Sequence, residues 1–159
     1  MSEKVNWDVR LLELARYISG WSKDESTKIG TVIADDSHVV RATGYNGLCR
    51  GLNDNVKARN ERPLKYRWYE HGERNAIYNA ARIGIPMEGC TIYLMSLCCT
   101  DCARAIIQAG IKRIVTTPPE YDNPRWGPDL LIAKEMLDEA GIQIKIVDTS
   151  PGTVIGNKV

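Results

Sequence analysis

Two short stretches of the sequence hold residues whose types and spacing suit metal-assisted chemistry. Cys99 and Cys102 form a Cys-x-x-Cys pair at the start of an expected helix, where two thiols converge and the helix N-terminus favours thiolates. His71 opens another expected helix and offers a third ligand. Three protein ligands leave the fourth position of a tetrahedral zinc for water, which is typical of catalytic rather than structural sites. Glu73, two residues after the histidine, is a candidate for taking the proton of that water and returning it to a substrate.

Hydrophobic periodicity and turn residues predict the elements that must position these side chains. The expected helices span 6–19, 72–83, 99–108 and 130–140, and the expected strands span 29–34, 39–43, 91–95, 113–116 and 142–147. The order α-β-β-α-β-α-β-α-β predicts a layered α/β domain. We expect parallel strands in its second half and one antiparallel hairpin at an edge.

The segment 44–70 has no clear periodicity, and we expect it to be mostly irregular. Between Arg50 and Glu70 it holds six basic residues and three acidic ones. A loop of this length inside a compact domain is more often functional than idle. A solvated loop and a site for a ligand or a subunit are both open interpretations of this basic insert.

Composition limits the classes of protein that fit. The 159 residues suit one domain, 1–159, with a core over about 6–148 and a tail at 149–159. A net charge of +1, from 21 basic and 20 acidic residues, provides no global field for nucleic acids or acidic membranes. We find no apolar run of membrane-spanning length and no signal-peptide core, so we expect a cytoplasmic protein, or one of the host cytoplasm if the source is viral. Thiols stay reduced there, and we expect Cys49, Cys90 and Cys98 to be ordinary interior residues.

Beyond this chemistry, the sequence resembles the zinc-dependent cytidine/deoxycytidylate deaminase family, and the deoxycytidylate (dCMP) deaminases within it in particular. The similarity runs from about Trp21 to Val147. The motifs that carry it are Ser22-Lys23-Asp24 with Gly30, Gly44-Tyr45-Asn46-Gly47, His71-Gly72-Glu73-Arg74-Asn75-Ala76-Ile77, and Cys99-x-x-Cys102-Ala103-x-Ala105-Ile106-Ile107. Two positions depart from the family pattern: Gly72 replaces a usual alanine, and Cys98 replaces a usual proline.

The resemblance implies a fold, a reaction and a set of residues. The fold would be a three-layer α/β/α cytidine-deaminase-like arrangement with a five-stranded mixed sheet. The reaction would be hydrolytic deamination of dCMP to dUMP and ammonia, with one catalytic Zn²⁺ per chain, supplying dUMP for thymidylate synthesis. Ser26 and Lys28 would face the 5′-phosphate, Asn46 the sugar, and the Gly72 N–H the pyrimidine carbonyl. Tyr121 would lie near the substrate.

The resemblance also implies regulation. Members of this family are commonly homohexamers that dCTP activates and dTTP inhibits, each bound with Mg²⁺. The effector candidates in this sequence are Lys23, Tyr45 and Gly47.

Other functions remain open at this point. A tRNA adenosine deaminase on the same fold would have a short segment before the zinc histidine and a basic surface, whereas here Asn46 and His71 are 25 positions apart. A riboflavin-pathway deaminase lacks support from the two upstream motifs. A zinc-stabilised binding module without catalysis is an alternative of a different class.

Overall fold

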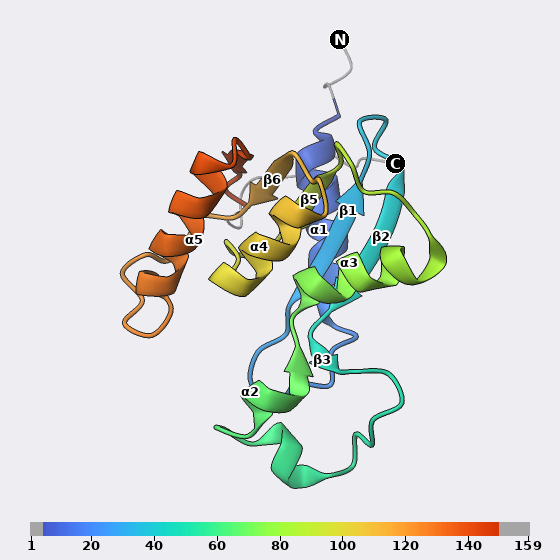
Figure 1. Ribbon diagram of the computed structural model, residues 1–159, viewed down its shortest axis with the longest axis vertical. Coiled ribbons are helices and arrows are strands. Elements are labelled where there is room, and N and C mark those ends of the chain that lie inside the picture. The colour runs from blue at the N-terminus through green and yellow to red at the C-terminus, as the bar shows by residue number, and fades with distance from the viewer. Residues whose placement is uncertain (1–4, 150–159) are drawn as a thin grey trace.

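The computed structural model describes residues 5–149 (Figure 1). Its helices are α1 (Trp7–Ser19), the 3-10 helix η1 (Lys57–Asn60), α2 (Lys65–Trp68), α3 (Gly72–Ile83), α4 (Thr100–Gln108) and α5 (Gly127–Glu139). Its strands are β1 (Gly30–Ala34), β2 (Val40–Tyr45), β3 (Gly47–Leu48), β4 (Tyr69–Glu70), β5 (Thr91–Leu94), β6 (Arg113–Thr116) and β7 (Gln143–Ile146). No helix within the described range is long and apolar enough to cross a lipid bilayer.

The main sheet has five strands in the order β2-β1-β5-β6-β7. Strand β1 pairs antiparallel with both β2 and β5, while β5, β6 and β7 run parallel to one another. The predicted parallel second half and antiparallel edge hairpin are therefore confirmed. The sheet is mixed because β1 faces an antiparallel partner on each side.

Helices cover both faces of this sheet, which gives the predicted three layers (Figure 1). The larger buried cluster lies on the side of α3, α4 and α5 and includes Ile92, Ile106 and Leu137. The smaller cluster lies on the side of α1 and includes Leu12 and Val115. Because β1 and β5 contribute to both clusters, the middle of the sheet is buried on its two faces.

The segment between β2 and α3 contains more regular structure than we expected. Strands β3 and β4 pair as a small antiparallel ladder, and η1 and α2 lie between them in sequence. Figure 1 shows this segment projecting away from the main sheet. We call residues 49–68, between the two short strands, the insert.

The start of α5 also differs from the prediction. It begins at Gly127 rather than at 130, because Pro128 occupies its first turn, where the missing N–H breaks no helical hydrogen bond. Pro128 is therefore a helix-start signal that lies just outside the predicted range. The expected frayed tail, 149–159, falls outside the described residues except for Thr149.

An ion cluster centred on the buried Asp8 joins α1 to the parallel strands. Asp8 accepts hydrogen bonds from Arg113 on β6, at 3.0 and 2.7 Å, and from Lys145 on β7, at 2.6 Å. Burial alone would raise the pKa of Asp8, but the hydrogen bonds from these two cations outweigh it and lower the pKa to about 2. Against the ordinary value of 3.8, this difference corresponds to about 2 kcal/mol of folding stability.

We predict that Asp8→Asn lowers the free energy of unfolding by about 2 kcal/mol at pH 7. The folded pKa lies below the unfolded one, so the contribution of Asp8 is complete above pH 3.8 and is lost as the pH falls toward about 2. Urea titrations at a series of pH values should therefore show the two proteins converging over that window. Asp122→Asn, at an exposed position, is the control. A stability difference that stays constant across this range would contradict the prediction.

Candidate active site

The starts of α3 and α4 bring the three predicted metal-ligating side chains together. His71 is the N-cap residue of α3 and Cys99 is the N-cap residue of α4, while Cys102 lies in the first turn of α4. The His71 Nδ1 atom is 3.4 Å from the Cys99 sulfur and 3.5 Å from the Cys102 sulfur. Among residues 5–149 this trio is the one group of three or more histidine, cysteine or acidic side chains placed to hold a metal ion.

The donor set fits zinc by chemistry and by spacing. An imidazole nitrogen and two thiolates are ligands that zinc prefers. With Zn–N near 2.0 Å and Zn–S near 2.3 Å, ligand atoms of a tetrahedral site lie about 3.5 Å apart. The observed nitrogen-to-sulfur separations of 3.4 and 3.5 Å agree with this value.

The surroundings favour negative charge on the sulfurs. The hydrogen bond from Cys102, helped by the neighbouring His71, lowers the pKa of Cys99 to about 4. The same bond, with Cys102 as donor, raises the pKa of Cys102. Arg74 Nη1 lies 3.5 Å from the Cys102 sulfur and is held there by an ion pair with Glu70. These surroundings favour the thiolate form that a metal ion requires of its cysteine ligands.

Glu73 lies in the first turn of α3, two residues after the histidine, and only 7% of its surface is exposed. Burial raises the pKa of this carboxyl. The turn that carries it is pressed against β2, because a Cβ at Gly44 would lie 2.3 Å from the Gly72 carbonyl oxygen and from the Ala76 nitrogen. Only glycine permits this approach of two backbones.

The glycine at position 72, where the family usually has alanine, has a local cause. A Cβ there would lie 3.2 Å from Thr31 Oγ1 and 3.2 Å from the Ile29 carbonyl oxygen, both tighter than ordinary contacts. The Thr31 side chain is fully buried and its hydroxyl has no hydrogen-bond partner among the described residues. Thr31 therefore occupies space that an alanine methyl at 72 would need.

The predicted substrate residues lie in three places. Asn46, directly after β2, is buried beside the loop 22–29, which also carries the exposed residues Ser26 and Lys28. Ser26 bonds to Asp24, and the Lys28 ammonium donates to a backbone carbonyl of the same loop at 2.6 Å. Tyr121 lies on the loop between β6 and α5 and packs against the larger core cluster. Their roles toward a substrate stay predictions.

The predicted effector residues lie around the same loop and the insert. The exposed Lys23 forms an ion pair with Asp54 of the insert. The Tyr45 ring stands edge-on to Trp21 with ring centroids 6.2 Å apart, and Gly47 belongs to the short strand β3. Their effector role likewise stays a prediction.

The remaining cysteines divide differently from our expectation. Cys98 is 1% exposed and belongs to the larger core cluster, as we expected of an interior residue, and the metal-compatible trio contains its neighbour Cys99. Cys90 is buried as predicted, whereas the prediction for Cys49 was wrong because that residue is exposed on the insert. Burial raises the pKa of Cys98, which keeps this thiol protonated.

Sequence reasoning missed several residues that support the site. Arg74 stood in a quoted motif, but its spacing from His71 did not reveal that it faces a cysteine sulfur. Asp129 accepts hydrogen bonds from the Thr100 N–H and hydroxyl, each at 2.9 Å, and thereby caps α4 next to Cys99. Lys65 was counted only among the charges of the insert, although it is buried and paired with Asp24. None of these pairings leaves a local sequence signal.

Comparison with known proteins agrees with this geometry. Residues 5–117 match the family described as the cytidine and deoxycytidylate deaminase zinc-binding region. A deaminase of Aliivibrio fischeri, described as uncharacterized and encoded in the luxG 3′ region, is 34% identical over 87% of this chain and 91% of its own. The deoxycytidylate deaminase of Enterobacteria phage T2 is 32% identical over 84% of this chain and 88% of its own.

Solved structures share the fold. The dCMP deaminase of cyanophage S-TIM5, crystallised in complex with dCMP and dUMP, superposes with a TM-score of 0.71 at 20% identity. The match covers 87% of this chain and 95% of that one.

These matches, together with the His71, Cys99 and Cys102 site at two helix starts, define a zinc-binding deaminase domain. The chain belongs to the cytidine and deoxycytidylate deaminase family. It is accordingly an enzyme of hydrolytic deamination.

The crowding at position 72 yields a prediction about stability. We expect Gly72→Ala to lower the free energy of unfolding by about 1 kcal/mol, as overpacking does. In a Thr31→Ala background one of the two tight contacts is gone, so the cost should fall by at least about 0.5 kcal/mol. Urea unfolding of the two single variants and the double variant measures this coupling. Strictly additive effects would show that Thr31 does not compete with a methyl at 72.

Proposed function

We propose that the chain hydrolyses dCMP to dUMP and ammonia and so supplies dUMP for thymidylate synthesis. The observation that carries the proposal is the His71, Cys99 and Cys102 trio with the buried Glu73 beside it, built on the starts of α3 and α4. The substrate is inferred from relatives named deoxycytidylate deaminase, including those of phage T2 and, at 28% identity over 89% of this chain, of Homo sapiens.

The metal site supports this reaction. His71 Nδ1 and the sulfurs of Cys99 and Cys102 would hold one Zn²⁺ per chain, since their spacing and chemistry suit it. When bound, zinc supplies a Lewis acid that brings the pKa of a water near neutrality. Arg74, at the Cys102 sulfur, would stabilise the thiolate form that the metal requires.

Glu73 would move the protons. Deamination consumes one water and releases ammonia. One of the two water protons ends on ring nitrogen N3, where the dUMP product keeps it, and the other ends on the departing amino group. A single carboxyl beside the reacting carbon can serve all these transfers in turn. The burial of Glu73 excludes bulk water from competing as proton donor. The Gly72 N–H, at the first position of α3, has no partner within the helix and would donate to the pyrimidine carbonyl.

The remaining contacts would bind the nucleotide. Asn46 would contact the sugar, and the exposed Lys28 ammonium, with Ser26 nearby, would contact the 5′-phosphate. Tyr121 would border the pyrimidine from the loop before α5.

We extend the proposal to regulation. dCTP with Mg²⁺ would activate the enzyme and dTTP with Mg²⁺ would inhibit it, through Lys23, Tyr45 and Gly47, in a homohexamer. The support is that Lys23 and Tyr45 are exposed and that Lys23 lies on the same loop as Ser26 and Lys28. An effector there would act on the loop directly.

We predict that the zinc-loaded protein releases ammonia from dCMP. dCMP, CMP, cytidine, dCTP and a tRNA anticodon stem-loop should be compared at equal concentration by ammonia release. The phosphate and sugar contacts make dCMP the best of these substrates. Preferential turnover of the stem-loop would replace the proposal with a tRNA deaminase, and no turnover by zinc-loaded protein would favour a binding module.

Repeating the dCMP assay with dCTP and with dTTP tests the regulation, and rates that do not respond would contradict it.

We predict that Glu73→Gln lowers kcat for dCMP by about 10³-fold, because it removes the proton carrier and leaves every metal ligand in place. Zinc content, measured by atomic absorption, should remain that of the wild type. Glu139→Gln, at the exposed end of α5, is the matched control and should keep wild-type turnover. Near-normal turnover in Glu73→Gln would show that another group carries the proton.

A further inference from the structure

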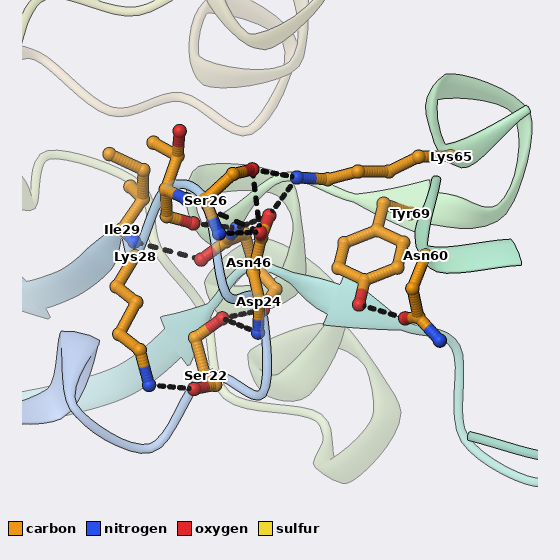
Figure 2. A network of polar contacts seen from close by, with 10 residues as sticks. Ser22, Asp24, Ser26, Lys28, Ile29, Asn46, Asn60, Lys65 and Tyr69 are labelled. Atoms are coloured by element: carbon orange, nitrogen blue, oxygen red, sulfur yellow. Dashed lines mark hydrogen bonds and ion pairs between the residues drawn. The ribbon is translucent and has the colours of Figure 1, made fainter. Parts of the chain in front are cut away.

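Lys65 of the insert reaches into the loop 22–29 and is buried there (Figure 2). Its residue surface is 6% exposed, which makes it the one buried lysine among the described residues. The ammonium pairs with the Asp24 carboxylate and donates to Ser26 Oγ at 2.7 Å. Its remaining side faces the Tyr69 ring, 5.3 Å from the ring centroid. Two acceptors and one aromatic ring of the protein thus lie around the Lys65 ammonium.

The Asp24 carboxylate is the centre of this network. Its Oδ1 atom accepts from the Ser26 N–H and hydroxyl at 2.8 and 2.9 Å and from the Thr27 N–H at 3.2 Å. Its Oδ2 atom accepts from Lys65 and from Asn46 Nδ2, the latter at 3.1 Å. Lys65 is the only cation among these donors, so it alone offsets the charge of a carboxylate that is 4% exposed.

Asn46 is fixed in one orientation by the same network. Its Nδ2 atom donates to Asp24 and, at 2.8 Å, to the Thr27 carbonyl. Its Oδ1 atom accepts from the Ile29 N–H at 2.8 Å. Both amide hydrogens are therefore committed to the protein, and one lone pair of Oδ1 is left. This side chain can accept one further hydrogen bond and can donate none.

Asn46 is also close to the catalytic turn. The Asn46 N–H donates to the Ile29 carbonyl oxygen at 3.1 Å, and the same oxygen is the atom that a Cβ at Gly72 would meet at 3.2 Å. Ile29 thus contacts both Asn46 and the residue between His71 and Glu73. Asn46 and the turn that carries Glu73 therefore pack against the same backbone oxygen.

We propose that Lys65 and Asp24 are positioning residues that hold the Asn46 amide so that it accepts a hydrogen bond from a hydroxyl of the substrate sugar. The inference rests on the proposed function, and it assigns to the insert a part in sugar recognition. Without Lys65 the buried carboxylate has no countercharge and must take up a proton or turn toward water. In either case the Asp24 carboxylate no longer holds the hydrogen bond from Asn46 Nδ2 in place, and the Asn46 amide is free to rotate.

The test compares dCMP with 2′,3′-dideoxycytidine 5′-monophosphate, which lacks the sugar hydroxyl. In the wild type we expect kcat/KM to favour dCMP by about tenfold, the effect of one neutral hydrogen bond. In Lys65→Met this preference should fall to about twofold or less, through a higher KM for dCMP, while kcat/KM for the dideoxy substrate changes little. Lys65→Arg, which keeps the cation, should restore part of the preference.

Lys57→Met is the matched control, since Lys57 lies on the same insert with its side chain 91% exposed. It should keep the wild-type preference. If Lys65→Met does not fold, the double variant Asp24→Asn/Lys65→Met removes both buried charges together and should fold, with the preference still reduced. Thermal unfolding and zinc content establish folding for each variant.

The outcomes separate this inference from the proposed function. Suppose that the wild type prefers dCMP to the dideoxy substrate, and that the Lys65 variants keep this preference at lower overall activity. That result would overturn the positioning role and leave Lys65 a purely structural one. Equal wild-type turnover of both substrates would also overturn it. A wild type that turns over neither substrate would instead refute the proposed function.

Discussion

The site depends on the contact between the backbone of β2 and the first turn of α3. At Gly44 the two chains approach so closely that any side chain would overlap the Gly72 carbonyl and the Ala76 nitrogen. Gly30 makes a similar approach on the other face, where a Cβ would lie 1.9 Å from the Ala15 carbonyl oxygen of α1. The first two strands are thus held between two helices by backbone contacts, which have no side-chain rotamers through which to adjust. This fixes where α3 begins, and with it His71 and the two residues that follow.

The start of α4 is fixed by a hydrogen-bonded cap from a neighbouring helix. Asp129 of α5 accepts from the Thr100 N–H and hydroxyl, so the helix that follows the cysteine pair is capped by its neighbour rather than by its own N-cap side chain. Cys99, although it stands at the N-cap position, therefore remains available to a metal. The side chains at the two helix starts also lie close together, and the positive end of each helix favours the negative charge that two thiolates bring.

The sequence predicted the elements well because the core obeys simple periodicity, and it predicted the metal trio because ligand types and helix starts are local features. It failed where the structure depends on contacts between distant segments. The pairing of Lys65 with Asp24, 41 positions apart, has no counterpart in spacing or composition. Thr31, whose hydroxyl has no partner among the described residues, crowds position 72. This contact depends on which strand faces the start of α3, which the sequence does not show. The exposure of Cys49, which we expected to be buried, depends on where the insert leaves the core.

The position of the metal site does not depend on the length of the insert, because the chain closes behind the insert at β3 and β4. Gly47 pairs with Glu70 across β3 and β4, so the residue after Asn46 and the residue before His71 are held opposite each other. The entropy of closing the intervening loop grows only slowly with its length. The insert therefore does not position the zinc histidine. It contributes contacts with the rest of the domain. Three of those contacts are the ion pair of Lys65 with Asp24, the ion pair of Asp54 with Lys23, and the stacking of Tyr66 with Arg125. The Arg125 guanidinium, on the loop before α5, lies 4.8 Å from the Tyr66 ring centroid. These contacts join the insert to the two loops that the sequence associates with substrate, so a change in the insert can alter nucleotide recognition while the metal site stays as it is.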